Sequence, residues 1–183
     1  MLSGRPEHAA GSAITCVMEG TRPLLLEVQA LLAHSNYGYG RRTASGTDYN
    51  RVNLLLAVLE KHLNMPLSDC DAFVNVTGGM RLNDPSLDLA MILALYSSYR
   101  NIPLDAETMV FGEVGLAGEV RNVNMLEQRV KEAEKLGFNT CIVPKAGLKT
   151  LKNIKGIRII GVENVKEAIN TMKNALNESP NIV

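Results

Sequence analysis

The chain has 183 residues, of which 46% are hydrophobic, and its formal charge at pH 7 sums to zero. This length accommodates one compact domain or two small ones with a sizeable core. No run of about 18 apolar residues suggests a membrane-spanning helix, and the first eight residues have no apolar signal-peptide centre. Cys16, Cys70 and Cys141 are odd in number and far apart. They predict free thiols in a reducing cytoplasm and no metal site.

The charges are unevenly spread along the chain. Residues 61–120 hold three Lys or Arg against eight Asp or Glu, whereas residues 121–173 hold eleven against five. The net charges are therefore −5 and +6. Such asymmetry is compatible with an anion-binding face, including one for nucleic acid, and equally with solvated helix faces that differ in sign.

Hydrophobic periodicity and turn residues predict the elements in chain order. Residues 1–11 are expected to be a linker, residues 34–46 a glycine-rich loop, and residues 177–183 a loose tail. Thr47 or Asp48 is expected to cap the first helix. Glycines punctuate residues 110–120, which indicates a bent strand or hairpin, and Gly137 is placed to end a helix in the left-handed conformation. The expected strands are 12–18, 24–33, 72–77, 140–143 and 157–160, and the expected helices are 47–63, 84–95, one from Leu126, a short basic one after Pro144, and 163–176.

Hairpins come early and strand–helix–strand units come late, which predicts a mixed α/β or α+β domain over residues 12–176. The most informative stretch follows the third expected strand. The Gly78–Gly79 pair is succeeded by Asp84, a good helix N-cap, and by Pro85, which suits the first helical position. Ser86 then lies in the first turn of an apolar helix. There it could be a nucleophile at the positive helix end, or an ordinary first-turn serine.

Common cofactor motifs are absent from the sequence. Residues 147–150, Gly-Leu-Lys-Thr, have a Leu before the Lys and no upstream glycine at the spacing of a phosphate-binding loop. No GxGxxG follows a strand, and neither a His-Glu-x-x-His motif nor a paired-cysteine metal motif occurs. We therefore expect no nucleotide and no metal in this chain.

Two stretches resemble the Lon-type peptidases. Asp84-Pro85-Ser86 before an apolar helix is similar to their serine motif, and Gly112-Glu113-x-x-Leu116-x-Gly118-x-Val120 is similar to the segment that leads to their catalytic lysine. A desolvated, neutral lysine takes the serine proton in such a dyad. Counting on from Gly112, the residue at the lysine position is Glu127. Leu87 and Asp88 replace the small pair after the serine. A degenerate peptidase site is therefore expected, and Lys131 is spaced for an i,i+4 ion pair with Glu127.

Further stretches, at residues 19–24, 28–31, 45–51 and 55–61, resemble the C-terminal Lon-like domain of the RadA (Sms) family of bacterial DNA repair proteins. The resemblance covers residues 1–175 and implies an α+β, Lon-protease-like fold. It also implies that the chain is a fragment. The zinc finger and the RecA-like ATPase of that family, with their Zn, ATP and Mg, are not in this sequence.

The resemblance implies a role in homologous recombination, alongside the recombinase machinery. Family members are ATP-driven, ring-forming branch-migration machines, and their Lon-like domain is thought to scaffold a hexamer and to help bind DNA. We expect a cytoplasmic, catalytically inactive domain of this kind. A purely structural module without DNA contact and an active Ser–Lys peptidase are the alternatives.

Basic residues that are candidates for DNA contact fall into two groups. Arg41 and Arg42 lie in the glycine-rich loop with Tyr37 and Tyr39 nearby, and Arg51 follows at the helix start. The second group, in the basic C-terminal third, is Lys145, Lys149, Lys152 and Lys155. An intersubunit contact or a solvated surface is the alternative for each group.

Overall fold

The computed structural model describes residues 9–36, 38–78 and 82–178, with side chains as far as residue 174. Most of the expected linker and tail, together with Tyr37 and Gly79, lies outside these residues. The elements run in this order: β1 (Ser12–Glu19), β2 (Arg22–His34), β3 (Arg42–Ser45), α1 (Tyr49–Leu63), β4 (Cys70–Val76), η1 (Pro85–Leu87), α2 (Asp88–Arg100), β5 (Thr108–Val110), β6 (Glu113–Val114), β7 (Val120–Arg121), α3 (Leu126–Lys135), β8 (Thr140–Pro144), η2 (Lys145–Leu151), β9 (Arg158–Val162) and α4 (Val165–Glu178).

One mixed sheet organises the described part of the chain. Its strand order is β3-β4-β2-β1-β5-β8-β9, and β6 and β7 form a separate two-stranded hairpin. β1, β2 and β4 pair antiparallel, while β1–β5, β5–β8, β8–β9 and β3–β4 pair parallel. The early hairpin, the late parallel units and the hairpin within residues 110–120 were all expected and are confirmed. The fold is therefore α/β with a seven-stranded mixed sheet.

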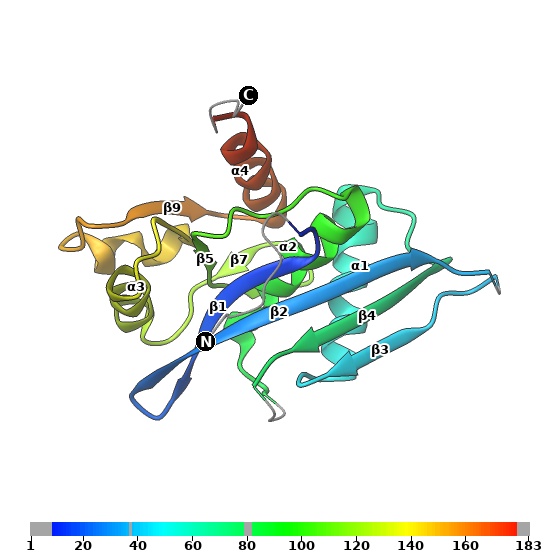
Figure 1. The fold of residues 1–183 in the computed structure, drawn as a ribbon, viewed down its shortest axis with the longest axis horizontal. Coiled ribbons are helices and arrows are strands. Elements are labelled where there is room, and N and C mark those ends of the chain that lie inside the picture. The colour runs from blue at the N-terminus through cyan, green and yellow to red at the C-terminus, as the bar shows by residue number, and fades with distance from the viewer. Residues whose placement is uncertain (1–8, 37, 79–81, 179–183) are drawn as a thin grey trace.

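Helices cover the two faces of the sheet unequally (Figure 1). The larger hydrophobic core joins α1, α2 and α4 to one face of the sheet, and residues 88–97 of α2 are buried on every side. The smaller core packs α3 and η2 on the other face, against β1, β5 and β8. On that second face the start of β2 packs against the smaller core through Leu25. The rest of β2, with β3 and β4, carries no helix there among the described residues, and Leu31 of β2 is 56% exposed.

Local signals set several boundaries as the sequence predicted. Asp48 caps α1 by accepting a hydrogen bond from the Arg51 amide at 3.0 Å. Gly137 follows α3 with φ of 85°, the left-handed conformation that glycine adopts without strain.

Two expectations about residues 34–46 and 84–95 need correction. The first is not all loop, because β3 forms within it and pairs parallel with β4. This short edge strand is alternately exposed, so hydrophobicity alone does not reveal it. The second is not one helix: η1 supplies a 3-10 turn, and α2 then continues to Arg100, where Asn101 ends it in the left-handed conformation.

Candidate functional site

Ser86 lies at the start of the buried helix, behind a side-chain cap. The Asp84 carboxylate accepts a hydrogen bond from the Ser86 amide at 2.9 Å, and Pro85 occupies the first position of η1, as expected. Ser86 itself is only 1% exposed. Burial opposes ionisation of Asp84, but hydrogen bonds from Ser86 and the charge of Arg129 hold the pKa of Asp84 below its ordinary value. The Ser86 turn therefore faces an ionised carboxylate and a guanidinium.

The side chain that contacts Ser86 is Arg129 of α3, which is completely buried. Its Nη1 donates to the Ser86 Oγ at 2.8 Å and to the Cys16 carbonyl oxygen at 2.5 Å. Its Nη2 donates to the Asn124 Oδ1 at 2.8 Å and to the Asp84 Oδ2 at 3.1 Å, and its Nε donates to the Asn124 carbonyl oxygen at 3.0 Å. All three guanidinium nitrogens are thus hydrogen-bonded within the chain.

This arrangement defines what Ser86 can do. A guanidinium stays protonated in proteins and has no acceptor, so Arg129 donates to the hydroxyl and cannot take its proton. In a Ser–Lys dyad the neutral amine would accept that proton. The geometry supplies Ser86 with a permanent hydrogen-bond donor where a dyad needs a base.

Glu127, which residue counting placed at the lysine position, makes no recorded contact with Ser86 among the described residues. Its side chain is 42% exposed and pairs with the Lys131 Nζ at 2.6 Å, the i,i+4 ion pair that the spacing predicted. The structure therefore places Arg129, two residues further on, against the serine. The sequence analysis did not single out Arg129, although it is three residues after Leu126 and four before Ala133 on the buried face of α3.

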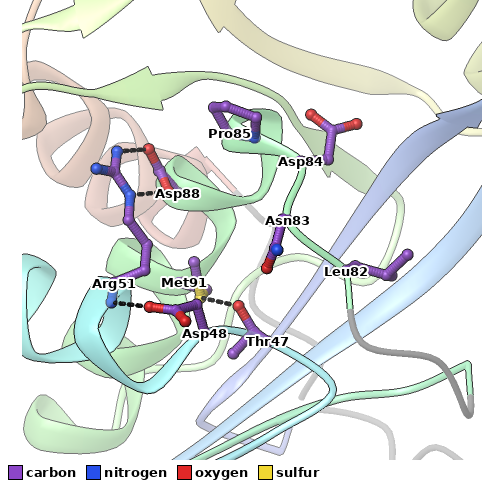
Figure 2. A pocket seen from close by; sticks show the side chains of 9 residues that line it. All are labelled: Thr47, Asp48, Arg51, Leu82, Asn83, Asp84, Pro85, Asp88 and Met91. Atoms are coloured by element: carbon purple, nitrogen blue, oxygen red, sulfur yellow. Dashed lines mark hydrogen bonds and ion pairs between the residues drawn. The ribbon is translucent and has the colours of Figure 1, made fainter.

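The buried Asp88 and the half-buried Arg51 form a second ion pair beside this turn (Figure 2). The Arg51 Nε donates to the Asp88 Oδ1 at 2.8 Å, its Nη2 donates to the other carboxylate oxygen, and Nη2 also donates to the Val114 carbonyl at 2.9 Å. The Val114 amide returns a 3.0 Å hydrogen bond to Asp88. Burial raises the pKa of Asp88, while the hydrogen bonds from Arg51 and Val114 oppose that rise. The pair ties α1, α2 and β6 together.

A pocket of about 180 Å³ opens beside this ion pair. Figure 2 shows Arg51 and Asp88 turned toward each other on one side of it, with Asp48 and Met91 below and Asn83 opposite. The pocket carries both signs of charge. No group of three or more His, Cys, Asp or Glu that could hold a metal ion occurs among the described residues.

The first group of predicted DNA-contacting residues is largely engaged within the chain. Arg41 pairs with the Asp71 Oδ2 at 2.8 Å, and this hydrogen bond is the main cause that lowers the pKa of Asp71 to about 2. Arg42 donates to the Leu67 carbonyl at 2.9 Å and to the Cys70 carbonyl. Arg51 is held by Asp88, as described. Arg41 alone of these three arginines keeps most of its side chain exposed, at 66%.

The second group lies on and after η2. Lys145 pairs with the Glu163 Oε1 at 2.8 Å, and this hydrogen bond raises the pKa of Lys145. Lys149 and Lys152 are exposed, Lys149 in η2 and Lys152 at its C-cap. Residues three apart are eclipsed along a 3-10 helix, so these two ammonium groups project from neighbouring positions. Lys155 is exposed a few residues further on.

The fold and the Ser86 site together define a mixed α/β domain with a serine at the start of a buried helix, held by an arginine. A family model described as subunit ChlI of Mg-chelatase matches residues 50–147. The chain is 50% identical over 170 residues to the DNA repair protein RadA of Bacillus subtilis. It is 46% identical to that of Halalkalibacterium halodurans and 44% identical to that of Streptococcus pneumoniae, each over 168 residues.

These alignments cover 92 to 93% of this chain but only 37 to 40% of the relatives. The chain belongs to the family of the ChlI model and is homologous to the C-terminal portion of bacterial DNA repair protein RadA. The resemblance to the RadA family that the sequence analysis stated is thereby confirmed. No helix in the described residues is long and apolar enough to cross a membrane.

Proposed function

We propose that this chain is the non-catalytic, Lon-like scaffold domain of a RadA-type recombination ATPase. In this role it promotes assembly of a hexameric ring in the cytoplasm, assists DNA binding and works alongside the recombinase machinery. Homology to proteins named DNA repair protein RadA supports the assignment to DNA repair. A serine at the start of a buried helix behind a side-chain cap is compatible with a Lon-like framework.

The single observation that carries the non-catalytic assignment is the hydrogen bond from Arg129 to Ser86. A protonated guanidinium cannot act as the general base, and the 1% exposure of Ser86 leaves no room for a substrate carbonyl at its oxygen. The purified chain is therefore expected neither to degrade unfolded casein nor to react with a fluorophosphonate probe. Cleavage that disappears in Ser86→Ala would establish the peptidase alternative instead.

Ring assembly requires two different complementary surfaces on each subunit. The helix-free face of β2, β3 and β4 is a candidate for one of these two surfaces. Leu31 and Phe73 lie directly opposite each other on this face, on paired strands. A shallow groove that these two residues help to line measures about 290 Å³. We propose that a neighbouring copy covers this face. Light scattering of the 183-residue chain tests the proposal, and a strictly monomeric mass contradicts autonomous assembly.

For DNA contact we propose Lys149 and Lys152 as the stronger pair, because both are exposed and no ion pair of theirs is recorded among the described residues. Arg41 and Lys145 are weaker candidates, because each already pairs with a carboxylate that reduces its charge toward phosphate. Arg42 and Arg51 are proposed more weakly, since their guanidinium groups already donate within the chain.

The matching experiment is a titration of fluorescein-labelled single-stranded DNA at several salt concentrations. Lys149→Gln with Lys152→Gln is expected to lower the slope of log K against log salt by about 1.4, at roughly 0.7 per phosphate contact. The double variant Lys131→Gln with Lys135→Gln removes the same charge from α3 and is the control. Absence of any salt-dependent binding by the unaltered chain favours the purely structural module.

A further inference from the structure

A cationic groove lies away from Ser86, between the last turns of α1 and α2 and one side of α4. It measures about 290 Å³, and its charged lining side chains include Arg100, Lys166 and Lys173. No aspartate or glutamate is among the described residues that line it. The groove therefore gathers charge of one sign from two helices that are distant in sequence, Arg100 from α2 and the two lysines from α4.

Within the described part of the chain, no carboxylate forms an ion pair with Arg100, Lys166 or Lys173. Two of the three instead lie over aromatic rings: Lys173 Nζ is 5.5 Å from the centroid of Tyr96, and Arg100 Cζ is 5.2 Å from that of Tyr99. Cation–π contact holds a charged group in place without cancelling its charge.

The helix ends reduce this positive charge but do not remove it. α1 and α2 both end beside the groove, at the C-cap residue Asn64 and at Arg100, and each helix C-terminus is equivalent to roughly −0.5 charge. Two such ends offset about one of the three cations, which leaves roughly two positive charges facing a concave surface. This surplus exceeds what capping of the two helices requires.

We propose that this groove binds phosphate groups, with Arg100, Lys166 and Lys173 contacting the phosphate oxygens. Guanidinium and ammonium groups are the side chains that pair with phosphate, and several neighbouring cations suit a ligand with more than one negative charge. Tyr96 is 4% exposed and lies under Lys173, so it offers no open face on which a base could stack. The site recognises phosphates and not bases.

Two sources share this chemistry, a nucleic-acid backbone and a free polyphosphate. The choice of nucleic acid rests on the proposed function, whereas the phosphate site itself does not. The groove also differs from the lysines of η2, which line no part of it. Failure of the groove as a phosphate site and failure of the proposed DNA contact through Lys149 and Lys152 can therefore be told apart.

The test uses the 183-residue chain with Lys166→Gln and Lys173→Gln, two exposed positions. Inorganic tripolyphosphate is titrated by calorimetry, and labelled single-stranded oligothymidylate by fluorescence anisotropy. Loss of two charge-assisted hydrogen bonds is expected to weaken each ligand at least about tenfold. Lys131→Gln with Lys135→Gln, which makes the same change in net charge on α3, is expected to leave both affinities within about twofold, since exposed charges at a distance are screened.

Weakening of both ligands by the groove variant alone supports the site with nucleic acid as its source. Weakening of tripolyphosphate alone supports the site and overturns nucleic acid as the source. Unchanged affinities, equal losses in the control variant, or no binding of either ligand by the unaltered chain overturn the site. DNA binding that depends on Lys149 and Lys152 but not on the groove overturns nucleic acid as the source of the phosphate and leaves the proposed function standing.

Discussion

The Nη1 of Arg129 donates a hydrogen bond to the Ser86 hydroxyl over 2.8 Å, across 43 residues of sequence. The same guanidinium reaches the Cys16 carbonyl on β1 and the Asp84 carboxylate. It therefore joins α3, β1 and the start of the buried helix, and it links the two sides of the sheet. The residue next to the serine is therefore a structural cation, and its loss should lower the free energy of unfolding of the whole domain.

Replacing Arg129 by Met is expected to destabilise the chain strongly. The change leaves Asp84 without its cationic partner, while the Cys16 and Asn124 carbonyls lose their donor. Breaking a buried ion pair from one side typically lowers the free energy of unfolding by about 3–5 kcal/mol. Urea unfolding at pH 7 measures the change.

Glu127→Gln is the matched comparison, because it breaks an exposed ion pair on the same helix. Such pairs contribute about 0–1 kcal/mol. Equal losses in the two variants would show that the buried guanidinium has no special role.

Arg51→Met is expected to destabilise the chain in a pH-dependent way. At pH 7 the variant leaves Asp88 buried and without its cation, for a loss of about 3–5 kcal/mol. Burial already raises the pKa of Asp88, and removal of Arg51 raises it further. A raised folded-state pKa means that stability is greatest below the unfolded value and falls as pH rises through the folded value.

The loss in Arg51→Met should therefore shrink as the pH is lowered and Asp88 becomes protonated. Urea unfolding of the variant and the unaltered chain between pH 7 and pH 4 measures this trend. A loss that is independent of pH would contradict the account of Asp88.

Local signals made part of this structure predictable. Asp48, Asp84 and Pro85 determine helix starts through contacts within three residues, so the sequence alone indicates them. The β1–β2 hairpin is equally local. By contrast, β3 is stabilised by pairing with β4, about thirty residues away, and its alternating polar residues resemble a loop.

The site was harder to predict because its partners are remote. Counting residues from Gly112 predicts Glu127 at the lysine position. In the structure, Met125 precedes α3 in the left-handed conformation with φ of 52°, and the helix turns Arg129 toward Ser86. The available signal was the spacing of Leu126, Arg129 and Ala133 on one face. The sequence makes Arg51 a candidate for DNA contact or for an intersubunit contact, and it does not reveal the partner Asp88, which lies 37 residues away. DNA contact by the basic residues stays a prediction.

Acid should weaken the chain partly through Asp71. Its pKa is lowered to about 2, chiefly by the hydrogen bond from Arg41. A depressed folded-state pKa contributes stability that is present above the unfolded value, near 3.9, and is lost as the pH falls toward the folded value. Unfolding midpoints should therefore drop between about pH 4 and pH 2.

Asp71→Asn removes this titration, so its midpoint should fall less steeply over the same interval. Asp105→Asn removes a carboxylate from the other half of the sheet, before β5, and serves as the control. An identical acid profile for Asp71→Asn and the unaltered chain would contradict the role of the Arg41 hydrogen bond.

Leu31→Glu is expected to reduce the mass of the assembled chain and to leave its stability nearly unchanged. Leu31 is 56% exposed on the helix-free face, so a charge there stays hydrated in the isolated chain, and surface changes typically alter stability by less than about 0.5 kcal/mol. Once a second copy covers this face, the same carboxylate is buried without a partner. Light scattering and urea unfolding together separate the effect on assembly from the effect on stability.

Leu136→Glu, at a 47% exposed position at the end of α3, is the control and should not change the mass. A mass that is unaltered by Leu31→Glu, or lowered equally by Leu136→Glu, would show that copies do not meet through the face of β2, β3 and β4.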